Sequence, residues 1–290
     1  METCERPGPG EVVRRGPGRA VAALAGACHP GPAAAVTGLA TALAAVAGQS
    51  GGRCVLAGTA VLAGQVSVGW SNDAFDARRD AAAGRRDKPV ASGAVGEEVV
   101  WGAAFTALAL CVPLSLACGP LAGAVHLAGV AAAWAYNLRL KATLWSWLPY
   151  AVGFASLPAF VVLALPGRPW PAWWLVAAGA LLGVGAHLAD VLPDIAADVA
   201  TGVRGLPHRL GVRRTGPALP VPLLVATAVL AFGPPGAPDA AGPAALAVAA
   251  SATAAGVRCG RWWERAPFAA AVVVAAVDVA LLLVRGAALT

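Results

Sequence analysis

Long apolar runs alternate along the chain with short segments that hold most of the polar residues. Each run is rich in Ala, Val, Leu and Gly, and about twenty apolar residues suffice for a helix to cross the hydrocarbon core of a bilayer. The breaks between runs contain Gly, Pro or clustered charges, which end helices. The pattern predicts about nine membrane-spanning helices, at approximately 30–49, 54–71, 98–118, 120–138, 143–165, 171–189, 215–233, 241–258 and 266–285.

Composition agrees with this pattern. Hydrophobic residues make up 58% of the chain and charged residues only 12%, roughly half the charged share of a soluble domain. A soluble α/β enzyme is therefore excluded. We expect an all-α integral membrane protein with its helices in one bundle, comprising a flexible cytoplasmic tail over residues 1–24 and a single polytopic domain over 25–290. The loops at 72–97 and 190–213 are expected to cap a cavity that opens to the cytoplasm.

Basic residues are distributed unevenly between the two sides of this topology. Positive charge near the ends of spans is retained in the cytoplasm. With the N-terminus inside, all of the Lys and Arg residues except Arg53, Arg168 and Arg285 fall on the cytoplasmic side. We therefore expect a multi-pass protein of the cell membrane whose C-terminus lies outside. Because topology accounts for the net charge of +6, nucleic acid is not an expected partner.

Acidic residues form two groups of three beside predicted spans two and six. The first group is Asp73, Asp76 and Asp80, and the second is Asp190, Asp194 and Asp198. Spacings of i, i+3, i+7 and i, i+4, i+8 stack carboxylates on one helix face. The repulsion between these carboxylates requires a compensating cation. Carboxylate oxygens are suitable ligands for Mg²⁺, and the side-chain oxygen of Asn72 can serve as a further, neutral ligand. A solvated acidic face is the alternative interpretation.

Basic residues follow both acidic groups. Arg86 and Lys88 lie in the segment 84–93, and Arg209 follows the second group together with Arg204 and His208. Carboxylates that hold metal, next to cationic hydrogen-bond donors, form a site suited to a diphosphate. The alternative role for each arginine is to set the membrane topology.

The acidic groups resemble the two motifs of the UbiA superfamily of intramembrane prenyltransferases, NDxxDxxxD and DxxxD, over residues ~25–285. Between them, Tyr136 and Lys141 are similar to the YxxxxK that follows the family's fourth helix, and Leu148-Pro149-Tyr150 to the segment that enters its fifth. The resemblance implies nine helices and Mg²⁺-dependent transfer of a prenyl group from a polyprenyl diphosphate to an aromatic or lipid acceptor in the membrane. No obligate protein partner is expected.

The resemblance also implies roles for individual residues. The catalytic residues are Asp73, Asp76, Asp190 and Asp194; the metal ligands are Asp73, Asp76, Asp80, Asp190, Asp194 and Asp198; and the substrate-binding residues are Asn72, Arg86, Lys88, Tyr136, Lys141, Tyr150 and Arg209.

Two other functions remain open at this point. A membrane terpene cyclase of the same superfamily has the same diphosphate site and captures the allylic cation internally. A non-catalytic transporter or lipid-binding protein is the second alternative, although transporters usually carry their charges near the bilayer midplane. Asp278 does lie inside the ninth predicted span, where an ionisable group suggests a function.

Overall fold

The computed structural model describes residues 17–236 and 239–285, and these residues are helical apart from turns and connecting segments. Nine helices of this part of the chain are long. They are α2 (Pro30–Val46), α3 (Gly51–Ala82), α4 (Glu97–Ala117), α5 (Pro120–Leu138), α6 (Leu148–Leu163), α7 (Trp173–Val191), α11 (Pro220–Phe232), α12 (Ala241–Cys259) and α13 (Ala266–Arg285). The short elements are α1 (Pro17–Ala27), η1 (Leu140–Ala142), α8 (Ile195–Ala200), α9 (Leu206–Leu210) and α10 (Val212–Ala218).

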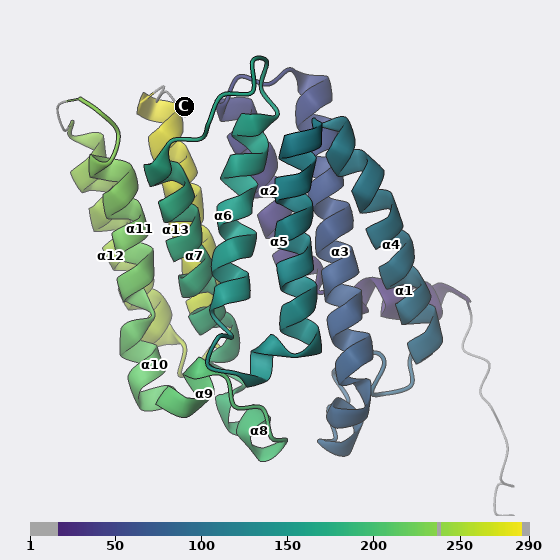
Figure 1. Cartoon of the computed structure of the whole chain (residues 1–290). Helices are drawn as coiled ribbons and strands as arrows, with labels where there is room; N and C mark the ends of the chain where they lie inside the picture. The colour runs from purple at the N-terminus through teal and green to yellow at the C-terminus, as the bar shows by residue number, and fades with distance from the viewer. Residues whose placement is uncertain (1–16, 237–238, 286–290) are drawn as a thin grey trace, which may run out of the picture.

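The long helices form an antiparallel bundle (Figure 1). Six segments of the described residues are long and apolar enough to cross a membrane, namely α3, α4, α5, α7, α13 and the continuous α10–α11 segment Val212–Phe232. The helices α2 and α6 are shorter and apolar, and α12 packs against α11 and α13. The predicted all-α membrane fold is confirmed.

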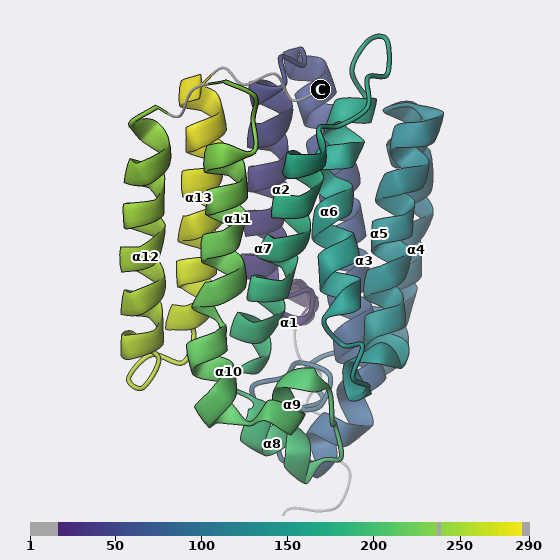
Figure 2. The ribbon, with the colours of Figure 1, turned by 60° about the vertical axis from the view of Figure 1, so that its left-hand side comes forward.

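Contacts between the helices close the bundle into a ring. Each long helix packs against the next one along the chain, and α13 returns to pack against α2 and α7. At one end of the ring, α8 and α9 lie below the bundle next to the C-terminal end of α3 (Figure 2). Both acidic motifs therefore reach the same end of the bundle, as their positions after spans two and six predict.

Prolines explain why several helices begin where the apolar runs begin. Pro30, Pro120, Pro149 and Pro220 each occupy one of the first two positions of α2, α5, α6 or α11. The first turn of a helix has no intrahelical acceptor for its N–H groups, so proline loses nothing there and its fixed φ favours the helix.

The first acidic motif lies on a helix, which corrects the predicted loop at 72–97. The apolar run ends near residue 71, but α3 continues to Ala82. Its last turns remain covered because α1 and the segment after α3 pack against them: Ala27, Ala74, Ala77 and Val90 share one buried cluster. A polar motif with helical spacing can extend a helix beyond the apolar run when its neighbours bury one face.

The residues that precede α2 also differ from the expected tail. Residues 17–24 belong to α1, which runs across the long helices (Figure 1). The indole Nε1 of Trp70 donates a hydrogen bond to the backbone oxygen of Leu24 (2.8 Å), which ties α1 to α3. Residues 1–16 of the predicted tail lie outside the described residues.

Small residues bring α6 and α7 close together beside the acidic end. A Cβ atom at Gly183 would collide with the backbone of Tyr150 and with the side chain of Phe154. Glycine therefore allows α7 to approach α6 where Tyr150 begins the helix, and this approach brings Tyr150 near the carboxylate at the end of α7.

Candidate active site

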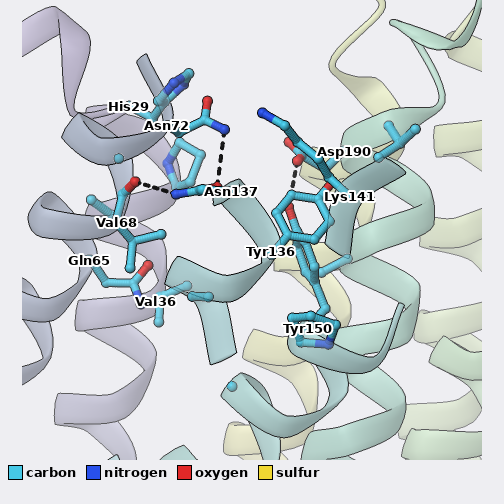
Figure 3. Close-up of a pocket in the computed structure, with 18 of the residues that line it drawn as sticks. His29, Val36, Gln65, Val68, Asn72, Tyr136, Asn137, Lys141, Tyr150 and Asp190 are labelled. Carbon is cyan, nitrogen blue, oxygen red and sulfur yellow. Dashed lines mark hydrogen bonds between the residues drawn. The ribbon is translucent and has the colours of Figure 1, made fainter. Parts of the chain in front are cut away.

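A cavity of about 290 Å³ lies inside the ring at the acidic end. Its wall is formed by α2, α3, α5, α6 and α7, with further residues from the segment after α3 and from α8 and α9. Figure 3 shows Gln65 and Asn72 on one side of it, opposite Tyr150 and Asp190. The deeper wall is mostly apolar, and the charged residues gather near the cap. The cavity thus has a charged end near the cap and an apolar interior.

The three carboxylates of the first motif have different environments. Asp76 pairs with Lys141 and with Arg79, whose Nη2 lies 2.8 Å from the Asp76 carboxylate. Asp80 lines the cavity 4.0 Å from the guanidinium of Arg79. Asp73 is buried and is not part of the cavity wall. Its carboxylate instead lies 3.4 Å from the Lys88 ammonium and accepts a hydrogen bond from the backbone N–H of Val90 (3.4 Å). Asp73 therefore holds the segment between α3 and α4, residues 83–96, against α3.

All three carboxylates of the second motif line the cavity. Asp190 accepts a hydrogen bond from the Tyr150 hydroxyl (2.7 Å), while Asp194 lies 3.5 Å from the Arg85 guanidinium. Asp198 lies 3.0 Å from His208 Nε2.

The predicted continuous helical face for the second motif is wrong. Helix α7 ends at Val191, and α8 begins at Ile195. Pro193 lies between the two helices, and proline has no N–H to continue the hydrogen-bond ladder. The break turns α8 under the bundle, so the three carboxylates reach the cavity from two separate helices and the turn between them.

The cations of the cavity differ in part from the predicted ones. Lys88 and Lys141 line it, as expected, and so do Arg79 and Arg85. Arg86 and Arg209, which we predicted to bind substrate, are exposed outside the cavity wall.

Local contacts explain why Arg85 lines the cavity while Arg86 and Arg209 do not. Arg85 lines the cavity and forms ion pairs with Asp87 (3.2 Å) and Asp194 (3.5 Å), whereas Arg86 is exposed. The Arg209 guanidinium donates to the backbone oxygen of Arg204 (3.0 Å). Helical i+3 spacing from Asp76 was a sequence signal for Arg79, whereas the direction of Arg85 depends on a turn that the sequence pattern does not specify.

Asn72 belongs to an amide network between α3 and α5. Its Nδ2 donates to Oδ1 of Asn137 (3.1 Å), and the Asn137 amide donates to the backbone oxygen of Val68 (2.9 Å) and to Ser71 Oγ (2.8 Å) (Figure 3). Buried amides with this many partners are rigid. Asn137 was not among the predicted site residues, and the network fixes the register of the two helices at the level of the acidic motif.

Aromatic side chains form the wall beside Asp190. The Tyr136 and Tyr150 rings meet edge to face with centroids 5.1 Å apart, and His187 packs 4.9 Å from the Tyr150 ring. Both tyrosines line the cavity, as predicted. Their ring faces can stabilise a nearby cation.

Burial changes the proton affinity of two basic groups at the cap. Desolvation lowers the pKa of Lys141, and the carboxylate of Asp76 opposes this shift. Desolvation also lowers the pKa of His29 to about 4, with smaller contributions from the charges of Lys88, Arg265 and Arg85. His29 is therefore neutral near pH 7, and its Nε2, 3.2 Å from the Lys88 ammonium, can accept a hydrogen bond from it.

The donor chemistry of the cavity fits Mg²⁺. Carboxylate oxygens are the hard ligands that this ion prefers, and five carboxylates line the wall beside two arginine and two lysine side chains. Within the described residues, no three such ligands converge on one point, because the aspartates contact Lys, Arg, His or Tyr side chains instead. The excess of one negative charge on the wall means that a bound diphosphate, which brings several more, requires additional cations.

Solved structures with the same fold are UbiA homologs. One from Aeropyrum pernix K1 superimposes with a TM-score of 0.66 at 20% identity, over 87% of this chain and 97% of that one. A second, from Archaeoglobus fulgidus and bound to GPP and Mg²⁺, superimposes with a TM-score of 0.67 at 14% identity, over 90% of this chain and 98% of that one. The bundle therefore has the fold of the UbiA homologs.

Sequence comparison identifies the family. The sequence profile described as the UbiA prenyltransferase family matches residues 33–284, and the chain belongs to this family. The bacteriochlorophyll synthase 33 kDa chain of Cereibacter sphaeroides is 36% identical over 166 residues, which are 52% of this chain and 53% of that protein. The match thus spans about half the length of this curated relative.

Proposed function

We propose that the protein transfers a prenyl group from a prenyl diphosphate to a lipophilic acceptor inside the membrane, with Mg²⁺ as cofactor. The observation that carries this proposal is the single cavity in which both acidic motifs meet four cationic side chains above an apolar interior. The Archaeoglobus fulgidus homolog with the same fold is bound to GPP and Mg²⁺. A diphosphate matches the ionic end, and a prenyl chain matches the interior.

The side chains of the cavity support each part of this reaction. When bound, Mg²⁺ stabilises the negative charge that develops on the leaving diphosphate, and Asp76, Asp80, Asp190, Asp194 and Asp198 are its proposed ligands. Lys88, Lys141, Arg79 and Arg85 donate charge-assisted hydrogen bonds to the remaining oxygens. Tyr136 and Tyr150 shield the allylic cation from water and face it with aromatic rings.

Product analysis tests this proposal. The purified protein in lipid nanodiscs is expected to release diphosphate from geranyl, farnesyl or geranylgeranyl diphosphate only when Mg²⁺ and an acceptor are present. Mass spectrometry of the extracted lipids should then show an acceptor that has gained the prenyl group. A cyclic hydrocarbon without any acceptor adduct would identify a terpene cyclase, and absence of Mg²⁺-dependent diphosphate release would exclude both enzymes.

We further propose that the cavity opens to the cytoplasm. Within the described residues, all Lys and Arg side chains except those of Arg53, Arg168 and Arg285 lie toward the cavity end of the bundle. The positive-inside rule assigns this end to the cytoplasmic face, which places the end of α13 outside.

Cysteine labelling tests this orientation. In a variant without the six native cysteines, Arg86→Cys and Arg209→Cys should react with a membrane-impermeant maleimide only after the cells are opened. Trp170→Cys is the matched control because Trp170 is 75% exposed in the connection between α6 and α7, at the opposite end. It should react in intact cells. Labelling of Arg86→Cys in intact cells would contradict the orientation, and labelling of Arg86→Cys and Arg209→Cys from different sides would contradict the shared site.

A further inference from the structure

A second pocket lies deeper in the bundle than the ionic site. It has a volume of about 90 Å³ and is enclosed by α2, α6, α7, α11 and α13. Val36, Phe154 and Leu157 line both this pocket and the main cavity, so the two spaces adjoin at these side chains. The wall of this pocket is apolar, and Asp278 on α13 is its one polar residue among the described residues.

Asp278 is buried without a hydrogen-bond partner among the described residues. Its exposed fraction is 2%, and neither carboxyl oxygen accepts or donates a hydrogen bond. The Thr227 hydroxyl is close enough to interact with the Asp278 carboxyl, but it donates to the backbone oxygen of Leu223 (3.3 Å) and has no hydrogen-bond geometry to either carboxyl oxygen. Asp278 lies twelve residues after the first residue of α13, which corresponds to about 18 Å along the helix. This depth is within the hydrocarbon layer.

An unpaired carboxyl group at this depth opposes folding. Polar groups in the hydrocarbon region are costly, and those that proteins keep there usually serve a function. A purely hydrocarbon occupant, such as the tail of a prenyl chain, would leave the carboxyl oxygens unpaired. An occupant with one hydroxyl or carbonyl group would pair with Asp278 while its carbon skeleton contacts the surrounding leucine, valine and phenylalanine side chains.

We propose that this pocket binds an uncharged lipophilic molecule through a hydrogen bond between its hydroxyl or carbonyl group and the Asp278 carboxyl. Two sources have this chemistry: the acceptor of the proposed reaction, which reaches the pocket past Val36, Phe154 and Leu157, and a lipid of the surrounding bilayer. The proposal requires no diphosphate chemistry, so binding can be measured without turnover.

Photolabelling with a matched pair of probes tests the proposal. Dodecanol and dodecane, each with a diazirine at the same carbon, are irradiated with the full-length protein in nanodiscs, and mass spectrometry maps the labelled residues. We expect the alcohol to label the pocket segments of α2 and α13 about fivefold more than the hydrocarbon, the effect of roughly one net hydrogen bond. Asp278→Asn should keep this preference, and the nearly isosteric Asp278→Leu should abolish it.

Two further measurements separate binding from a structural role. Asp278→Leu should raise the thermal unfolding midpoint, because it removes an unpaired polar group from an apolar site. Ala275→Leu fills the pocket but retains the carboxyl, and it should abolish labelling by both probes. Equal labelling by the two probes, an unchanged preference in Asp278→Leu, or unchanged labelling in Ala275→Leu would overturn the proposal, as would a lower midpoint for Asp278→Leu.

Competition then distinguishes the two sources. Displacement of the probe by 1,4-dihydroxynaphthalene points to an aromatic acceptor, and displacement by diacylglycerol points to a membrane lipid. Displacement by neither would contradict the proposal. Because labelling is independent of turnover, intact labelling in a protein that lacks prenyl transfer would refute the proposed function alone.

Discussion

Asp76→Asn and Asp190→Asn are each expected to lower kcat/KM for prenyl transfer by about 10²–10³-fold. An asparagine has nearly the same shape as an aspartate but lacks the charge that holds a metal ion, and a loss of this size corresponds to the few kcal/mol that one electrostatic contact contributes in a transition state. The two carboxylates come from α3 and α7 and line the same cavity, so both variants should fail in the same step. The measurement is the initial rate at saturating Mg²⁺.

Two comparisons make this result specific. Asp239→Asn should retain wild-type activity, because Asp239 is exposed and pairs with Arg285 at the opposite end of the bundle. Asp73→Asn should lose less activity than Asp76→Asn, because Asp73 contacts Lys88 and Val90 behind the cavity wall. Full activity of Asp190→Asn, or of the wild type in excess EDTA, would refute the metal hypothesis.

The positions of most helices could be predicted from apolar runs and their breaks. The predicted spans 120–138 and 266–285 coincide with α5 and α13, where Pro120 and the charged residues around α13 mark clear boundaries. The end of α3 could not be found in this way, because its last turns are polar and remain helical through contacts with α1 and the cap. Such tertiary contacts leave no local signal in an apolar pattern.

The composition of the site was easier to predict than the direction of its side chains. Both acidic motifs, both lysines and both tyrosines reach the same end of the bundle, because alternating antiparallel helices bring every second connection to the same end. Arg85 lines the cavity and Arg86 is exposed because of the geometry of the turn after α3, which the sequence pattern does not specify. Asp73 does not line the cavity, because it contacts Lys88 and Val90 of the segment after α3. Two sequence signals were present: the i+3 spacing from Asp76 for Arg79, and Pro193, which breaks the helix that the i, i+4, i+8 spacing suggested.

Lys141 is the cation whose role changes most between sequence and structure. The sequence motif predicts that the Lys141 ammonium donates a hydrogen bond to the diphosphate and takes no part in metal binding. In the structure its ammonium is buried in an ion pair with Asp76 and lies 5.2 Å from the centre of the Phe75 ring. The pair compensates Asp76 while no metal is bound, and a metal ion must compete with the ammonium for this carboxylate. We therefore expect Lys141 to affect both diphosphate binding and the affinity for Mg²⁺.

Lys141→Gln is expected to lower kcat/KM for the prenyl diphosphate by about 5–150-fold, equivalent to about 1–3 kcal/mol for a lost hydrogen bond to a charged group. The Mg²⁺ concentration that gives half-maximal activity should fall, because the competing ammonium is gone. Lys141→Arg should recover part of the rate because it keeps the charge. Arg139→Gln is the matched control, since Arg139 is exposed just before η1 and does not line the cavity. If Lys141 serves only membrane topology, both Gln variants will change the yield of inserted protein and leave the kinetics and the Mg²⁺ dependence of the purified enzyme unaltered.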